Sequence, residues 1–287
     1  MKAYPRCAPC LLARVHYEAT LSTDDPELQQ RAVQAGVRWL DDSFSINTPA
    51  TYISTGIHRR AYEVLGDEDP YAAKKKMSNE IALKVLPMAE KMVNEDDAFR
   101  RSIIASIVGN TLDFGVLGFE PEERFDVYLM DVFKKGLDVD DTDKMKGLLD
   151  DVLYIADNCG EIVFDGLVLD QIKRLGGKVT LVVKGAPILT DATLKEAEET
   201  GISKKADRVL TTGSNAVGVD LDEAPDELVK ALKNASLIIS KGMANYEALS
   251  EYDFRPIAYL LRAKCEPIAA SLGVKKGWNV AILYAFA

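Results

Sequence analysis

The spacing of apolar residues divides the chain into two parts. In residues 8–135, apolar side chains recur every three or four positions, the period of an amphipathic helix, and no segment has the character of a strand. This spacing predicts an all-α N-terminal region, a bundle or cap, with helices near residues 11–19, 26–42, 48–65, 69–86, 98–108 and 121–135. Pro87 is expected to end the fourth of these helices.

After an acidic stretch at residues 138–143, interpreted as a solvated turn or linker, strand-like runs alternate with helical ones. The predicted strands are 152–156, 179–184, 208–210, 237–240, 257–261 and 280–284. Helices fall between most of them, including one that opens with a capping box from Thr193 to Glu196. We expect an α/β fold with a largely parallel sheet between helices. The predicted division is a helical region, residues 1–143, and an α/β domain, residues 144–287.

The first of these strands leads into a polar turn and then a helix. Asp157 and Asn158 follow the strand at once, with Gly160 and Glu161 next, before apolar residues return at helical spacing. The turn offers two side-chain oxygen donors, a glycine at which backbone can approach a ligand, and a helix N-terminus suited to anions. We interpret it as a metal- and phosphate-binding site.

Other predicted strands also end in polar residues, namely Asp191, Ser214, Lys241 and Asn245. Because the carboxyl ends of parallel strands share one edge of a sheet, these side chains are expected to converge. Each also has a purely structural explanation. Asp191 can cap a helix, Asp157 and Asn158 can form a turn, Lys241 can be solvated and Ser214 can be a loop hydroxyl. Their joint occurrence at strand ends favours a site.

The residue types available in the chain limit which metal ion the predicted site can bind. The chain has only His16 and His58, interpreted as packing or surface residues, so a histidine-rich zinc or iron site is not expected. Aspartate and asparagine oxygens suit Mg²⁺ or Mn²⁺, with Co²⁺ or Ni²⁺ as substitutes. The alternative is a phosphatase mechanism in which Asp157 is the covalent nucleophile. That mechanism usually requires a second acid two residues later, where this chain has Cys159. We prefer Asp157 as a metal ligand.

Composition excludes some partners. The net charge of -10 argues against a nucleic acid or an anionic membrane as partner. No apolar run approaches the length of a membrane span, and residues 1–10 lack the apolar core of a signal peptide, so a cytoplasmic location is expected. No G-x-G-x-x-G follows the first strand, which disfavours a dinucleotide-binding domain. Oligomeric state is not predicted.

Several segments together resemble the damage-control phosphatase family, a group of metal-dependent phosphatases. They are residues 109–113 (GNTLD), 157–161 (DNCGE), 184–193 (KGAPILTDAT) and 240–247 (SKGMANYE). The pair Cys7 and Cys10 resembles the mark of a mainly prokaryotic subfamily, and the similarity extends across nearly the whole chain. The resemblance implies a helical region joined to a Rossmann-like domain, and hydrolysis of small phosphorylated metabolites such as sugar phosphates or damaged cofactor precursors.

Roles follow from the resemblance by position. It implies Asp157, Asn158 and Asp191 as metal ligands and Lys241 as the group that neutralises substrate phosphate. Asn110, Asp113 and Glu161 would surround them, and either Glu161 or Asp113 would be the base. Substrate contacts are expected from Lys241, Asn110, Gly160, Ser214 and Asn245. Cys159 stands where a small alanine is common.

Four cysteines leave a second question open. Cys7 and Cys10 supply two ligands, whereas a structural metal site normally needs four. Cys265 is a candidate third, and Cys159 a fourth only if the fold brings it near. Inert thiols, a metal or cluster site, and a redox pair are the alternatives.

Two other functions also stay open besides a phosphatase. One is a non-catalytic or transferase-type nucleotide-binding Rossmann domain, and the other is a regulatory module that binds a sugar phosphate without turnover.

Overall fold

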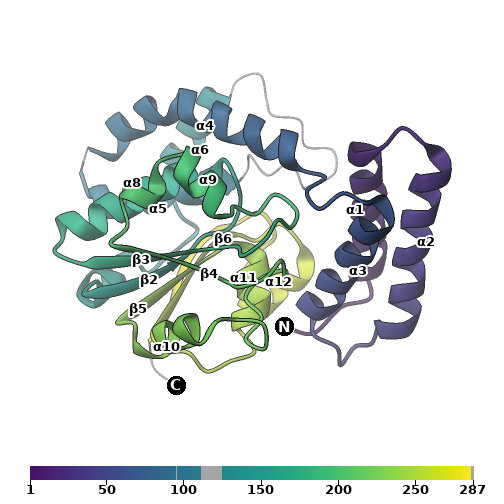
Figure 1. Ribbon diagram of the computed structural model, residues 1–287. Helices are drawn as coiled ribbons and strands as arrows, with labels where there is room; N and C mark the ends of the chain where they lie inside the picture. Colours follow the sequence, from purple (N-terminus) through teal and green to yellow (C-terminus); the bar gives the residue numbers. More distant parts are fainter. Residues whose placement is uncertain (95, 111–124, 286–287) are drawn as a thin grey trace.

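The computed structural model describes residues 1–94, 96–110 and 125–285. Helices α1 (Cys7–Ser22), α2 (Pro26–Ser43) and α3 (Ala50–Leu65) form a three-helix bundle beside the rest of the molecule (Figure 1). Asp25 caps α2 by accepting a hydrogen bond from the Glu27 amide, and Gly66 ends α3 with φ 65°. The apolar core of the bundle continues into Leu189 and Val217, which belong to loops of the second part.

A seven-stranded sheet forms the centre of the remainder. Its strands are β1 (Val139–Asp140), β2 (Asp151–Ile155), β3 (Lys178–Val183), β4 (Arg208–Thr211), β5 (Leu237–Lys241), β6 (Ile257–Arg262) and β7 (Asn279–Tyr284). The strand order is β1-β7-β6-β5-β2-β3-β4, and only the β6–β7 pair is antiparallel. The predicted α/β fold with a largely parallel sheet is confirmed.

Helices cover both faces of this sheet (Figure 1). One face carries α4 (Ala72–Val93), α5 (Ala98–Gly109), α6 (Phe125–Lys135), α8 (Glu161–Arg174) and α9 (Leu194–Glu199). The other carries α10 (Asp226–Asn234), α11 (Gly242–Leu249) and α12 (Glu266–Leu272). The described residues also form the short helices α7 (Thr142–Met145), η2 (Lys146–Leu148) and η3 (Ile202–Lys204). The capping box of Thr193 and Glu196 opens α9 as predicted. No described helix is long and apolar enough to cross a membrane.

Two local predictions are wrong. Helix α4 continues through Pro87 to Val93. Pro87 and Leu83 are both exposed, so water can satisfy the carbonyl that proline leaves unbonded, while Ala82 and Ala89 hold the buried face. The acidic stretch is not a simple linker, because β1 pairs with β7 and the Asp138 and Asp141 carboxylates accept hydrogen bonds from β7 amides. The division of domains at residue 143 stays a prediction.

The strand order locates the site. The chain leaves β2 toward β3 and β4 and returns to the opposite side of β2 with β5. The carboxyl ends of β2 and β5 therefore flank the point where the winding reverses, with Ile155 opposite Ser240 in the ladder. Crevices of doubly wound sheets form at this position.

Candidate active site

Asp157 lies at this reversal point, directly against the start of α11. A Cβ added at Gly242 would lie 1.9 Å from Asp157 Oδ2, and Gly242 has φ 73°. Only glycine fits both the conformation and the space. The Lys241-Gly242 sequence thus allows the end of β5 to approach the carboxylate that follows β2.

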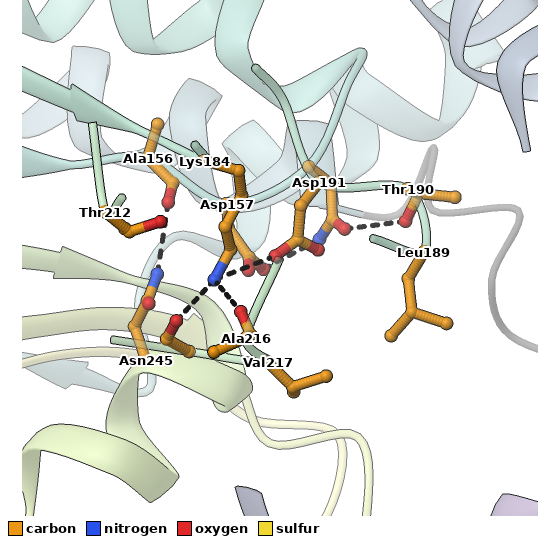
Figure 2. Close-up of polar contacts among 12 residues, drawn as sticks. Ala156, Asp157, Lys184, Leu189, Thr190, Asp191, Thr212, Ala216, Val217 and Asn245 are labelled. Atoms are coloured by element: carbon orange, nitrogen blue, oxygen red, sulfur yellow. Dashed lines mark hydrogen bonds and ion pairs between the residues drawn. The ribbon is translucent and has the colours of Figure 1, made fainter. Parts of the chain in front are cut away.

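The three predicted metal ligands come together. Asn158 forms an isolated antiparallel bridge with Asp191, and the Ala192 amide donates to the Asp157 carbonyl over 2.9 Å. The Asn158 side-chain amide donates to Asp157 Oδ2 over 2.7 Å, and its Oδ1 accepts from the Thr190 hydroxyl over 2.7 Å. Figure 2 shows Asp157, Thr190 and Asp191 in this arrangement. All three predicted ligands are at most 6% exposed.

Lys184, the residue after β3, connects the loop that carries Asp191 to the loop that follows β4. Its ammonium lies 3.4 Å from Asp191 Oδ2 and donates to the carbonyl of Ala216 over 2.8 Å and to that of Gly218 (Figure 2). Sequence reasoning assigned Lys184 no role. The one signal available was a charged residue at the end of an otherwise apolar strand.

Lys241 and Glu161 lie behind the ligands, both fully buried. Lys241 donates to Glu161 Oε1 and, over 2.8 Å, to Asp165 Oδ1. Burial alone would lower the pKa of Lys241, but Asp165 and Glu161 outweigh it and raise that pKa. Burial raises the pKa of Glu161. Asn110 links this pair to the ligands, because its amide donates to Glu161 over 2.7 Å and to Asp157 over 3.3 Å.

Asp165 anchors the same network and was missed from the sequence. Its Oδ1 accepts from Lys241, from the Ser106 hydroxyl over 2.6 Å and from the Tyr154 hydroxyl over 2.8 Å. Asp165 is fully buried within the apolar surface of α8. A buried carboxylate requires such partners, since an unpaired one would cost several kcal/mol.

A cavity of about 530 Å³ opens onto the ligands. We call Asn110, Asp157, Asn158 and Asp191 its sheet-side wall, and Arg6, Cys7, Cys10, Leu11 and Arg14 its bundle-side wall. The cavity also has lining residues with no predicted role, among them Lys264, Glu247, Leu189, Val217 and Met243. Lys264 donates to the Asn110 carbonyl over 2.7 Å.

Other predicted site residues lie around the cavity rather than on its lining, as far as the described chain extends. The Gly160 amide donates to Asn79 of α4 over 2.6 Å, and Asn245 donates to the carbonyls of Ala156 (Figure 2) and Lys241. The Ser214 hydroxyl accepts from the Ala216 amide over 3.2 Å. Lys241 and Glu161 are likewise absent from the lining. Asp113 lies outside the described residues.

Cys7, Cys10 and Cys265 line the cavity as free thiols. Burial raises the pKa of the Cys7 and Cys265 thiols. Across the described residues, no group of three or more His, Cys, Asp or Glu side chains is placed to hold a metal ion. The predicted ligand set differs from such a group because its third member is an amide. The cysteine alternatives stay open. His16 is exposed, whereas His58 is buried and its Nδ1 lies 2.8 Å from Glu18.

Comparison with known proteins gives consistent results. A "Damage-control phosphatase" of Archaeoglobus fulgidus is 47% identical over 98% of this chain and 99% of its own length. A second protein of that description, from Pyrococcus horikoshii, is 31% identical over 96% of both chains. The crystal structure of a DUF89 family protein from P. horikoshii matches 99% of both chains with a TM-score of 0.90 at 30% identity.

The family match covers nearly the whole chain. Residues 3–280 match the family described as the damage-control phosphatase ARMT1-like domain. That span includes both walls of the cavity and every predicted site residue. The chain therefore belongs to the ARMT1-like damage-control phosphatase family.

Proposed function

We propose that this protein is a metal-dependent phosphatase that hydrolyses small phosphorylated metabolites. The observation that carries the proposal is the cavity at the reversal point of the sheet, where Asp157, Asn158 and Asp191 share a lining with Lys264. Hydrolysis of a phosphate ester requires oxygen ligands that hold a metal cation and a positively charged group, such as an ammonium, that binds the phosphate. The phosphatase names of the family and of two relatives support the same reaction class.

The ligand set fits a hard divalent cation. Two carboxylates and one amide oxygen suit Mg²⁺ or Mn²⁺, with Co²⁺ or Ni²⁺ also compatible. The close approach of Gly242 keeps the space beside Asp157 free of a side chain. Thr190 orients Asn158, and Asn110 orients Asp157, each through a hydrogen bond. When bound, a divalent ion supplies positive charge for the phosphoryl group and makes water a better nucleophile.

The chain's own cations would complete the charge balance. Lys264 lines the cavity and would contact substrate phosphate directly. Lys241 as a phosphate-neutralising group stays a prediction. Its ammonium is held by Glu161 and Asp165, and Glu161 in turn accepts a hydrogen bond from Asn110. From there it adds positive charge and fixes Glu161. The choice of Glu161 or Asp113 as base also stays a prediction.

The test is release of phosphate. An aryl phosphate and a panel of phosphorylated metabolites are assayed with Mg²⁺, Mn²⁺, Co²⁺, Ni²⁺ or chelator. We expect turnover only with added metal, and a loss of about a thousandfold or more for Asp157→Ala. Asp131→Ala, which removes a largely exposed carboxylate on α6, is the matched control and should retain full activity.

Two results would refute the proposal. Asp157→Ala with near-normal activity would exclude the ligand role. Tight binding of a sugar phosphate or a nucleotide without release of phosphate under any metal condition would indicate a non-catalytic module instead.

A further inference from the structure

Helix α4 changes character along its length. Toward its C-terminus the buried positions are apolar, and Ala82, Ala89 and Val93 pack with α8 in one apolar cluster. Toward its N-terminus the buried positions are polar, and Lys75 and Asn79 are only 1% and 6% exposed. These two residues are four positions apart and therefore lie on one face of the helix. That face meets the two loops that carry the proposed metal ligands.

Asn79 binds the loop that follows β2. Its Oδ1 accepts a hydrogen bond from the Gly160 amide over 2.6 Å. Gly160 is buried, has φ 79° and directly precedes α8, so its amide needs an acceptor that the helix does not supply. Asn158 lies two residues before Gly160. The bond therefore fixes the turn that carries Asp157 and Asn158.

Lys75 binds the loop that follows β3. Its ammonium lies 3.0 Å from Glu196 Oε1 and donates to Asp69 over 2.9 Å. The other oxygen of Glu196 accepts from the Thr193 amide over 2.9 Å, within the capping box of α9. Thr193 lies two residues after Asp191. The ammonium thus holds the carboxylate that fixes the backbone beside Asp191.

Between these two contacts the loops bind each other. The Ala192 amide donates to the Asp157 carbonyl over 2.9 Å, and the Cys159 amide donates to the Thr190 carbonyl over 2.8 Å. The loops therefore form one unit, which α4 holds at Gly160 on one side and through the capping box on the other.

Helix packing alone does not favour these polar contacts. A buried ion pair usually contributes no more stability than apolar side chains of similar size, because desolvation offsets the attraction. Lys75 and Glu196 are nonetheless only 1% and 5% exposed. Directed hydrogen bonds and ion pairs do what apolar contacts cannot, because they fix one position and one orientation for each loop.

We propose that Lys75 and Asn79 are positioning residues of the metal site, which set where the two loops place Asp157, Asn158 and Asp191. The inference rests on the proposed metal-dependent function. Neither residue belongs to the cavity lining within the described chain, so both act through the loops and not on the substrate. Residues that orient metal ligands typically contribute about tenfold to a hundredfold to metal affinity.

Calorimetric titration with Mn²⁺ tests the proposal. Asn79→Leu keeps the approximate size of the side chain and removes the acceptor, and Lys75→Met keeps an unbranched chain and removes the ammonium. We expect each variant to bind Mn²⁺ about tenfold more weakly than the wild type. Asn79→Ser and Lys75→Gln are milder forms of the same changes and should weaken binding in the same direction.

Asn79→Asp assigns the effect to the hydrogen bond. Aspartate keeps an oxygen acceptor for the Gly160 amide, so this variant should bind Mn²⁺ no more weakly than the wild type. Exchange of the Gly160 amide with deuterium, followed by NMR without metal, should be faster in Asn79→Leu and as slow as in the wild type in Asn79→Asp.

Ser236→Ala is the matched control. The Ser236 hydroxyl also joins two segments, because it accepts from the Asp151 amide over 2.8 Å and donates to the Leu148 carbonyl over 2.7 Å. It does so at the amino ends of β2 and β5, opposite to the proposed site. Ser236→Ala should lower the free energy of unfolding and leave the Mn²⁺ affinity unchanged. Urea titration establishes that each variant is folded and gives its loss of stability.

Mn²⁺ affinities within about twofold of the wild type in both Asn79→Leu and Lys75→Met would overturn the inference. An affinity for Asn79→Asp as weak as that for Asn79→Leu would overturn it too. Failure of the proposed function is distinguishable, because then the wild type binds no Mn²⁺ or releases no phosphate. In that case amide exchange across residues 157–161 and 189–193 still tests the positioning, and rates that neither variant changes would overturn it.

Discussion

The two walls of the cavity are built differently. The sheet-side wall is buried and backed by a continuous network, from Asp157 through Asn110 and Glu161 to Lys241 and Asp165. The bundle-side wall is more exposed: Arg6 and Cys10 are exposed, and Cys7 and Arg14 are half-buried. A buried hydrogen-bonded network holds its side chains in one geometry, whereas exposed side chains can adapt to different ligands. The two walls therefore differ in how firmly the structure holds their side chains.

Breaking the network behind the sheet-side wall should have the largest effect on stability. Asp165→Ala removes a partner of buried Lys241 and leaves the Ser106 and Tyr154 hydroxyls without their acceptor. We expect a loss of about 3–5 kcal/mol in the free energy of unfolding, measured by urea titration. Asp170→Ala, on the same helix, breaks a partly exposed pair with Lys205 and should cost no more than about 1 kcal/mol. Similar losses for the two variants would contradict the stabilising role of the buried network around Asp165.

Gly242→Ala tests the close approach at the ligand itself. The added methyl group would collide with Asp157 Oδ2 and place alanine at φ 73°. We expect a loss of about 1–3 kcal/mol in stability and a metal affinity at least about tenfold weaker, because Asp157 must move. Gly147→Ala, with no heavy atom within 4 Å of its added Cβ, is the control and should be nearly neutral. Normal metal binding by Gly242→Ala in calorimetry would count against Asp157 as a ligand.

The sequence predicts the convergence at the sheet edge because parallel strands force it. Asp157 and Asp191 follow β2 and β3, Lys241 is the last residue of β5, and pairing of those strands brings their ends together. The role of Asp165 is not predictable in this way, because a single acid in an apolar helix resembles any half-exposed helical residue. Arg14 and Lys264 line the same cavity only because of tertiary packing, which no local sequence pattern reports. The strand β1 has two residues, too few for any periodicity to appear.

Tyr62 provides one hydrogen bond between the bundle and the loop that carries Asp191. The Leu189 amide donates to the Tyr62 hydroxyl over 3.2 Å, and Leu189 holds φ 47° two residues before Asp191. Tyr62→Phe removes only the hydroxyl, so we expect a loss of about 1 kcal/mol in stability and a severalfold weaker metal affinity. Tyr52→Phe changes a largely exposed tyrosine on the same helix and should change neither quantity. Unchanged metal affinity in Tyr62→Phe would show that the bundle does not position Asp191.

The smallest effect is expected where α3 meets the loop after β4. Arg59 donates to both carboxylate oxygens of Glu223, over 2.8 and 2.6 Å, and lowers the pKa of Glu223 to about 2, with help from Ser214. Since the folded pKa lies below the unfolded value of 4.5, this pair stabilises the protein fully above pH 4.5 and loses its effect as the pH falls toward 2.

Both side chains of this pair are about one-third exposed, so solvent limits its contribution to about 1 kcal/mol or less. The difference in unfolding free energy between wild type and Glu223→Gln should therefore shrink between pH 7 and pH 3. Glu63 is largely exposed and lies on α3, the helix that carries Arg59. Glu63→Gln should show no such trend. A gap for Glu223→Gln that stays constant with pH would mean that the joint between bundle and sheet relies on apolar contacts, such as Val217 with the core of the bundle, and not on this ion pair.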